Sequence, residues 1–198
     1  MSGKQDRAVP AAAAAGAEEE RLLSRSPEET RALGARLAGR LRRGDVVAFT
    51  GDLGTGKTCM IQGLCAALGV TDPVNSPTFV LITQYAGRLP VRAEARGEQR
   101  PDGAGEEIAI HHLDLYRLAG AEELLDIGAD EIMAGDGLSL VEWADRGAAV
   151  LPLPRWDVVL SHAGDGVRDI RCRYRARLSR SGDGPPWGGA AGDRQRIE

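Results

Sequence analysis

Gly51-Asp52-Leu53-Gly54-Thr55-Gly56-Lys57-Thr58 matches the phosphate-binding loop pattern G-x-x-x-x-G-K-[S/T] in full. The glycines of such a loop let successive backbone N–H groups turn inward around phosphate oxygens, where a Cβ would block the turn or the approach. The Lys57 ammonium is expected to reach the β- and γ-phosphates, and the Thr58 hydroxyl is expected to ligate Mg²⁺. The stretch therefore predicts a nucleotide site, and ATP is the nucleotide we expect there.

The segments on either side of the loop have the order that such a site requires. Residues 45–50 form a short apolar, β-branched run typical of a buried strand, and residues 59–68 predict a helix closed by Gly69. The start of that helix adds unpaired N–H groups and the positive end of a dipole to the anion site. A glycine-rich turn without a ligand would explain the glycines, but it gives no reason for a lysine followed by a hydroxyl side chain.

Length and composition predict one domain in a chain of 198 residues that is 42% hydrophobic. The formal net charge of -4 disfavours wholesale wrapping of nucleic acid, although a local basic face remains open. No apolar run approaches membrane-spanning length, and residues 11–15 are too short for the core of a signal peptide, so we expect a cytoplasmic protein.

The boundaries of that domain follow from local patterns. Residues 1–24 lack a periodic apolar face and predict a disordered lead, and residues 179–198 predict a disordered tail. The domain is expected over residues 25–178 and begins with a capping box that starts at Ser26. Within it, residues 86–107 are rich in glycine and charge and predict an exposed excursion.

Carboxylates stand at the ends of two predicted strands. Apolar runs predict strands at residues 80–85, 108–113 and 138–141, and a helix with a break at Gly128 is expected over residues 121–133. Asp114 and Glu142 follow the second and third runs, at the edge of an open α/β sheet where ligands bind. Asp114 is our first choice to bind Mg²⁺ with Thr58, and Glu142 is expected to orient the attacking water or a water of the metal. The structural alternative for Glu142 is a surface salt bridge, for example with Arg146.

Other residues near these positions have weaker functional interpretations. Thr78 lies in a loop that could close on the γ-phosphate. Trp143 is either a core or rim aromatic residue or, if exposed, a stacking partner for the base. His111 and His112 lie on opposite faces of one predicted strand, so at most one faces the core, and no third ligand is in register for a metal site.

Four segments together resemble the TsaE (YjeE) family of bacterial ATPases. They are Gly51–Thr58, Ser76–Phe79, Asp114–Leu118 (D-L-Y-R-L) and Val141–Trp143 (V-E-W). The last two, in this order, are more discriminating than the phosphate loop, and the resemblance extends over residues 26–178. The chain departs from the family pattern in having Thr55 where Ala is commoner, Phe79 where Tyr is common, and a long excursion at residues 86–107.

The resemblance implies a fold and a function. The fold is α/β, a P-loop NTPase-like three-layer arrangement with a mostly parallel central sheet and a C-terminal antiparallel hairpin. The function is that of an ATPase subunit that hydrolyses ATP with Mg²⁺ to support turnover of a complex making N6-threonylcarbamoyladenosine at position 37 of tRNA. The implied partners are a TsaD-type transferase and a TsaB-type protein, with tRNA reached through the complex.

Carried over position by position, the family's functional residues fall on the segments already named. The residues expected on the nucleotide are Asp52, Leu53, Gly54, Thr55, Gly56, Lys57, Thr58, Thr78 and Trp143. Those expected around the metal ion are Thr58, Asp114 and Glu142, and the catalytic groups are Lys57, Glu142 and Asp114.

The C-terminal segment shows a separate pattern, because apolar residues alternate with arginines at 171, 173, 175 and 177. It predicts a strand that pairs with residues 155–160 across the glycine-containing turn at 162–166. The arginine face is either a solvated edge that resists aggregation or a contact for tRNA phosphate or an acidic partner.

Two other classes of protein share the phosphate loop. A small-molecule or nucleoside kinase would transfer the γ-phosphoryl group to an acceptor under a closing lid, and Arg117 and Arg146 could serve there. A GTP-dependent switch is disfavoured because the chain has no N-K-x-D segment to recognise guanine.

Overall fold

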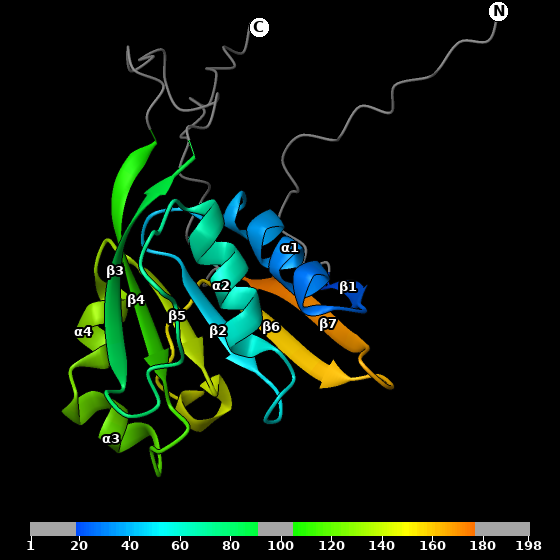
Figure 1. The fold of residues 1–198 in the computed structure, drawn as a ribbon. Coiled ribbons are helices and arrows are strands. Elements are labelled where there is room, and N and C mark those ends of the chain that lie inside the picture. The colour runs from blue at the N-terminus through cyan, green and yellow to red at the C-terminus, as the bar shows by residue number, and fades with distance from the viewer. Residues whose placement is uncertain (1–18, 91–104, 177–198) are drawn as a thin grey trace, which may run out of the picture.

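A computed structural model describes residues 19–90 and 105–176 of the chain (Figure 1). The strands are β1 (Glu19–Ser24), β2 (Val46–Thr50), β3 (Ile82–Leu89), β4 (Glu106–Asp114), β5 (Leu138–Glu142), β6 (Arg155–His162) and β7 (Arg168–Arg175). The helices are α1 (Pro27–Ala38), α2 (Lys57–Ala67), α3 (Ala121–Asp126), α4 (Ala129–Ala134) and the 3-10 helix η1 (Ala144–Gly147). The expected break between α3 and α4 is confirmed, because Gly128 separates them with φ of 68°.

All seven strands form one mixed sheet in the order β1-β7-β6-β2-β5-β4-β3. The four central strands are parallel, since β2 pairs in parallel with β5 and β6, and β5 pairs in parallel with β4. The outer pairs β3–β4, β6–β7 and β1–β7 are antiparallel. The structure confirms the predicted α/β fold with a parallel centre and a C-terminal hairpin.

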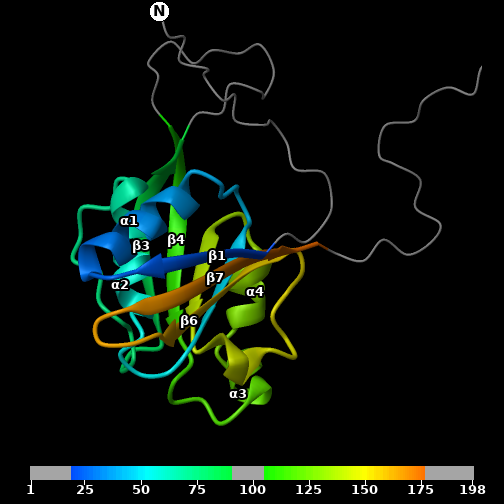
Figure 2. The same cartoon turned by 90° about the vertical axis from the view of Figure 1, so that its right-hand side faces the viewer.

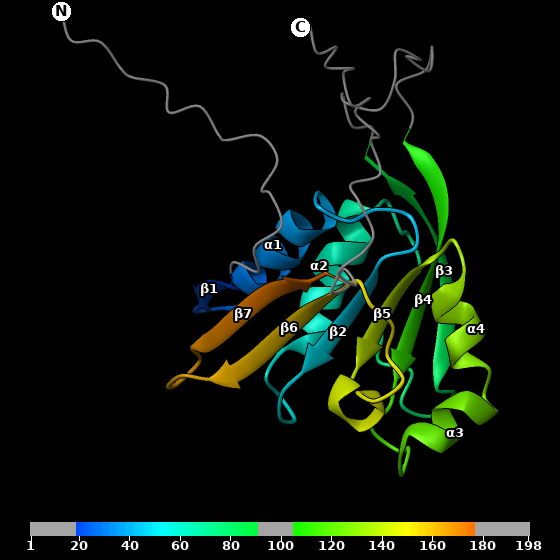
Figure 3. The same cartoon turned by 180° about the vertical axis from the view of Figure 1, so that it is seen from behind.

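Helices lie on both faces of the sheet, as Figures 1 and 3 show from opposite sides. Helices α1 and α2 cover one face, where Phe49 and Ile110 of the sheet pack with Met60 and Leu64 of α2. Helices α3 and α4 lie over the β3–β5 half of the other face, and their core includes Leu124 with Leu113 and Val141 of the sheet. In the part of the chain that the structure describes, no helix is long and apolar enough to cross a membrane.

Two glycines bring α1 and α2 into close contact. A Cβ on Gly34 would lie 2.0 Å from the Met60 carbonyl oxygen, and a Cβ on Gly63 would lie 2.0 Å from the Arg31 carbonyl oxygen. Each glycine therefore lets the backbone of the other helix approach. This contact fixes the position of α2, the helix whose first turn carries Lys57 and Thr58.

The predicted disordered lead over residues 1–24 is wrong for residues 19–24, which form β1 along β7 (Figure 2). The apolar pattern of residues 19–24 did not predict a strand, because this strand forms through its pairing with β7. The Arg21 guanidinium donates to the Asp169 carboxylate at 2.6 and 2.9 Å, and Ser24 is fully buried. Residues 1–18 and the predicted tail at 179–198 lie outside the described residues.

The same pairing corrects the expectation for the arginine strand. β7 is not an edge strand, because β1 lies on its outer side. Arg171 and Arg173 are exposed on its surface, as is Arg175, and Arg177 lies outside the described residues. Figure 2 shows β1 and β7 side by side.

The predicted excursion is also shorter than expected. β3 continues to Leu89 and β4 starts at Glu106, so only residues 91–104 of the segment 86–107 lie outside the described residues. The extension is stabilised by burial, because Gly87, Leu89 and Ile108 are buried while their neighbours Arg88 and Glu107 are exposed. Glycine and charge obscured this period-2 pattern in the sequence.

Candidate functional site

The phosphate loop connects β2 to α2 at the carboxyl end of the parallel strands. Gly51 has φ of 138°, and a Cβ there would lie 2.1 Å from the carbonyl oxygen of Leu160, so no other residue fits without displacing β6. Gly56, with φ of 100°, precedes the first helical residue. Thr55 is fully buried, and its hydroxyl donates to the Asp52 carbonyl at 2.8 Å. Thr55, which departs from the family pattern, therefore stabilises the loop through a buried hydrogen bond.

The Lys57 side chain is held inside this loop. Its Nζ donates to the carbonyl oxygens of Gly51 at 2.7 Å and Asp52 at 3.0 Å, and it lies 3.8 Å from the centre of the Trp143 ring. Burial lowers the pKa of the Lys57 ammonium, and the charges of Glu142 and then Asp114 oppose that shift. The cation of the loop thus lies close to both predicted carboxylates, in a position to exchange carbonyl oxygens for phosphate oxygens.

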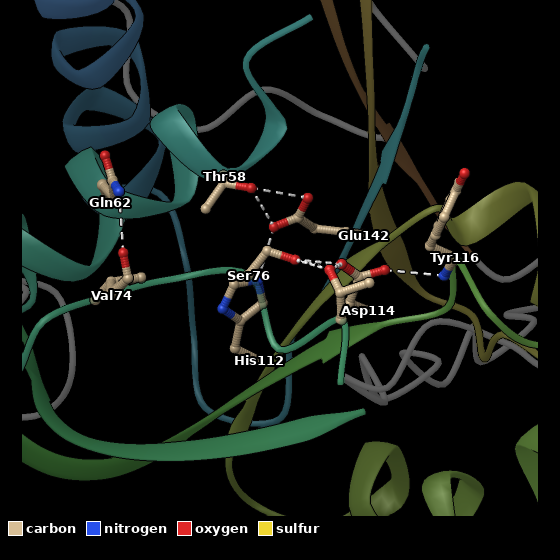
Figure 4. Close-up of polar contacts among 9 residues, drawn as sticks. Thr58, Gln62, Val74, Ser76, His112, Asp114, Tyr116 and Glu142 are labelled. Atoms are coloured by element: carbon tan, nitrogen blue, oxygen red, sulfur yellow. Dashed lines mark hydrogen bonds and ion pairs between the residues drawn. The ribbon is translucent and has the colours of Figure 1, made fainter. Parts of the chain in front are cut away.

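Thr58 and Glu142 meet beside the loop, as Figure 4 shows. The Thr58 hydroxyl lies 2.8 Å from Oε1 and 3.0 Å from Oε2 of the carboxylate, and Glu142 is only 3% exposed. The contact arises because β2 and β5 are parallel neighbours, so their carboxyl ends lie together. A surface salt bridge between Glu142 and Arg146 is wrong for this structure, since Arg146 donates to the Leu118 carbonyl instead.

Asp114 has a different set of partners. It lies opposite Glu142 in the β4–β5 register, but its carboxylate accepts hydrogen bonds from the hydroxyls of Ser76 and Thr78 and from the Tyr116 N–H at 2.8 Å. The Thr78 bond is 2.7 Å long. The structure therefore places Glu142 on the phosphate loop and Asp114 on the loop that contains residues 76–78 (Figure 4).

Trp143 turns the chain from β5 into η1. It has φ of 55°, a left-handed conformation that is costly for a residue with a bulky side chain. Its ring packs against Tyr116, with ring centres 4.9 Å apart, as well as over the Lys57 ammonium. The backbone turn at Trp143 thus places its indole ring against the Lys57 ammonium.

His112 is a site residue that the sequence analysis did not assign. The expectation that at most one of the two histidines faces the core is confirmed, because His112 is fully buried while His111 is half-buried. The His112 Nε2 lies 2.9 Å from Oε1 of Glu142. Its position two residues before Asp114, on the same face of β4, would have indicated this contact if the β4–β5 register had been known.

The hairpin between β6 and β7 contacts the other side of the phosphate loop. An Arg168 guanidinium nitrogen donates to the Gly54 carbonyl at 3.2 Å, and the His162 Nε2 lies 3.5 Å from the Leu53 carbonyl oxygen. No local pattern predicted these contacts, because they depend on the strand order. They support the exposed turn of the loop from the side opposite to Glu142.

The oxygen atoms at this site suit a hard cation. The Thr58 hydroxyl and the carboxylates of Glu142 and Asp114 are the type of ligand that Mg²⁺ prefers. Among the described residues, no group of three His, Cys, Asp or Glu side chains could enclose an ion alone. A magnesium ion here would take its remaining ligands from phosphate and water.

Known proteins are similar to this chain in sequence. The family model described as "Threonylcarbamoyl adenosine biosynthesis protein TsaE" matches residues 24–170. The tRNA threonylcarbamoyladenosine biosynthesis protein TsaE of Treponema pallidum (strain Nichols) is 36% identical over 150 residues, which cover 76% of this chain and 97% of the relative. The protein of the same name from Bacillus subtilis (strain 168) is 38% identical over 145 residues, covering 73% and 79%.

A solved structure is similar as well. The crystal structure of Bacillus subtilis YdiB aligns with a TM-score of 0.60 and 29% sequence identity, covering 81% of this chain and 88% of that one. The structural similarity therefore covers most of the chain.

Proposed function

Because this chain belongs to the TsaE family, we propose that it acts in the biosynthesis of threonylcarbamoyladenosine at position 37 of tRNA, as the subunit that binds and hydrolyses ATP. The observation that carries the proposal is the contact of the Thr58 hydroxyl with the Glu142 carboxylate at 2.8 Å, beside a complete phosphate loop. A hydroxyl and a carboxylate at this point are what ATP hydrolysis with Mg²⁺ requires.

Binding would exchange the partners of two residues. The Lys57 ammonium would leave the carbonyl oxygens of Gly51 and Asp52 and bind phosphate oxygens, while the backbone N–H groups of the loop surround the same phosphates. The Thr58 hydroxyl would turn from Glu142 toward the metal ion. The carboxylate of Asp114 or Glu142 would also hold the metal ion. Magnesium would neutralise the charge that develops on the phosphate oxygens.

Glu142 would then act on the attacking water. Its carboxylate is fixed at the end of β5 and buried, so it can accept a hydrogen bond from a water placed in line with the terminal phosphate. Asp114 would release the hydroxyls of Ser76 and Thr78 when it engages the metal, and this would free that loop to close on the nucleotide.

The partners we propose are a TsaD-type transferase and a TsaB-type protein. Large apolar side chains are exposed on the two loops of the site, with Leu53 79% exposed, Phe79 82% and Val80 68%. A partner surface that covers them would hold the loop at residues 76–81 in one conformation. The isolated chain is therefore expected to bind ATP but to hydrolyse it slowly.

The test follows γ-labelled ATP in the presence and absence of the two partner proteins. We expect release of inorganic phosphate without any acceptor, stimulated by the partners, together with modification of tRNA. Lys57→Ala serves as the negative control for ATP use by this chain. Transfer of the label to a metabolite would support a kinase instead, and stronger binding of GTP than of ATP would contradict the proposed nucleotide.

A further inference from the structure

His112 contacts the site from inside the sheet. It lies near the carboxyl end of β4, a strand between β3 and β5, and its side chain is fully buried. Its ring packs against Tyr85 of β3, with ring centres 6.5 Å apart. A side chain enclosed in this way has few alternative rotamers, so it is a rigid point in the structure.

Only one of its two nitrogens has a partner among the described residues. Nε2 lies 2.9 Å from Oε1 of Glu142, whereas Nδ1 is buried and has no hydrogen-bond partner. Because the acceptor is a carboxylate, Nε2 carries the hydrogen. In the neutral ring Nδ1 is then an acceptor.

The Glu142 carboxylate depends on few donors. It is 3% exposed, and among residues 19–90 and 105–176 the hydrogen bonds to its side chain come from the Thr58 hydroxyl and the His112 ring. A buried carboxylate is stable only if donors satisfy its oxygens. When the Thr58 hydroxyl turns to nucleotide and metal, the His112 Nε2–H remains to hold the carboxylate in place.

We propose that His112 is a positioning residue, whose Nε2–H keeps the Glu142 carboxylate at the phosphate loop throughout the ATPase cycle. It does so without contacting the nucleotide, and so it acts through Glu142. The inference rests on the proposed function, because the carboxylate that it positions is the one assigned to the attacking water.

The test compares His112→Leu, which removes the donor, with His112→Gln, whose side-chain amide can donate from a similar place. In the complex with the partner proteins, His112→Leu should lower kcat for ATP by about 10- to 100-fold while KM changes by less than about threefold. His112→Gln should recover most of that loss. His111→Leu, on the opposite face of the same strand, is the matched control and should keep kcat close to that of the wild type.

A double-mutant cycle separates positioning from a general loss of structure. If His112 acts through Glu142, then His112→Leu should lower kcat no further in a Glu142→Gln background. Additive losses in kcat would overturn the proposal. So would equal activity of His112→Leu and the wild type at equal melting temperatures.

Crystal structures of the two variants give a measurement that needs no ATPase activity. With Mg²⁺ and a non-hydrolysable ATP analogue bound, the Glu142 carboxylate should move away from the phosphate loop in His112→Leu, and in His112→Gln it should stay. An unmoved carboxylate in His112→Leu would contradict the inference even in an active protein. A wild-type complex that fails to hydrolyse ATP, with a carboxylate that moves as expected, would reject the proposed function and leave the positioning role intact.

Discussion

The Lys57 ammonium already lies at the centre of the phosphate loop, bound to two carbonyl oxygens and covered by an indole ring. A cation in this place holds the loop in its curved form before any phosphate arrives. In the proposed function, nucleotide binding would replace one set of oxygen partners by another, with little reorganisation of the backbone.

The different places of Lys57 and Glu142 predict different defects. Lys57→Ala should weaken ATP binding by about tenfold or more, because a charge-assisted contact with phosphate is lost. Glu142→Gln should bind ATP within about threefold of the wild type while turnover falls by roughly 100-fold, since we propose that the carboxylate acts on the attacking water. Calorimetric titration with ATP and steady-state turnover would measure both. Equal losses of affinity in the two variants would contradict this division of roles.

At the scale of single residues, the sequence predicted best the contacts between residues that are close together in the chain. Lys57 and Thr58 lie together in one loop, so their proximity followed from spacing alone. The position of Asp114 and Glu142 at the edge of the sheet followed from a general rule on the ends of parallel strands. Thr58 contacts Glu142, however, and not Asp114, which was our first choice as its partner at the metal. The contact of His112 with Glu142 did not follow, because it depends on the register of two strands.

At the scale of elements, the helix that begins at Lys57 is positioned by close packing against α1. Gly63→Ala adds a methyl group where the Arg31 carbonyl oxygen would lie 2.0 Å from it. The gain in helix propensity, about 1 kcal/mol, is smaller than the cost of separating two packed helices, so we expect a net destabilisation of about 1–3 kcal/mol. Urea unfolding measures this change in the free energy of unfolding.

Gly39→Ala is the matched control for that substitution. Gly39 has helical backbone angles, and a Cβ there would come no closer than 3.5 Å to the Arg36 carbonyl oxygen. Its free energy of unfolding should stay the same or rise by up to about 1 kcal/mol. An equal loss of stability in both variants would show that the contact between the helices is not the cause.

The attachment of β1 to β7 should depend on pH. A hydrogen bond from Arg21, followed by the charge of that guanidinium, lowers the pKa of the Asp169 carboxyl below its ordinary value of 3.8. The ionised form is favoured in the folded state, so its contribution to stability is complete above about pH 4 and is lost as the pH falls below that value. Urea midpoints of the wild type and Asp169→Asn should therefore differ by a constant amount from pH 7 to 5 and converge at lower pH.

Glu107→Gln provides the comparison for this measurement. Glu107 forms an ion pair with Arg88 in which both side chains are exposed, and such pairs contribute little to the free energy of unfolding. A constant difference between the wild type and Asp169→Asn down to pH 2 would contradict the role of this carboxylate. The strand itself was missed in the sequence because its partner β7 is 148 residues away at the Arg21–Asp169 contact.

At the scale of the whole molecule, the strand order determines what the phosphate loop can contact. β2 lies between β5 and β6, so the loop receives Glu142 from one side and the β6–β7 hairpin from the other. The sequence predicted every strand except β1, and the family resemblance implied the parallel centre, but no local signal encodes which strands are neighbours. The hydrogen bond from Arg168 to Gly54 could be found only in the assembled sheet.

The exposed apolar residues at the site predict where partner proteins act. Phe79→Ala should reduce stimulation of ATP hydrolysis by the partners by about 5- to 30-fold, because an 82% exposed aromatic side chain is available for burial in an interface. ATP affinity of the isolated chain should not change. Leu23→Ala, at a 49% exposed position on β1, should leave stimulation intact. Equal stimulation of the wild type and Phe79→Ala would place the interface elsewhere.

A crystal structure with Mg²⁺ and a non-hydrolysable ATP analogue tests the account most directly. We expect the phosphates inside the loop at residues 51–58, the Lys57 Nζ on phosphate oxygens instead of the carbonyls, and the Glu142 carboxylate facing the terminal phosphate. An analogue bound away from this loop, or a Glu142 carboxylate that points away from the terminal phosphate, would contradict it.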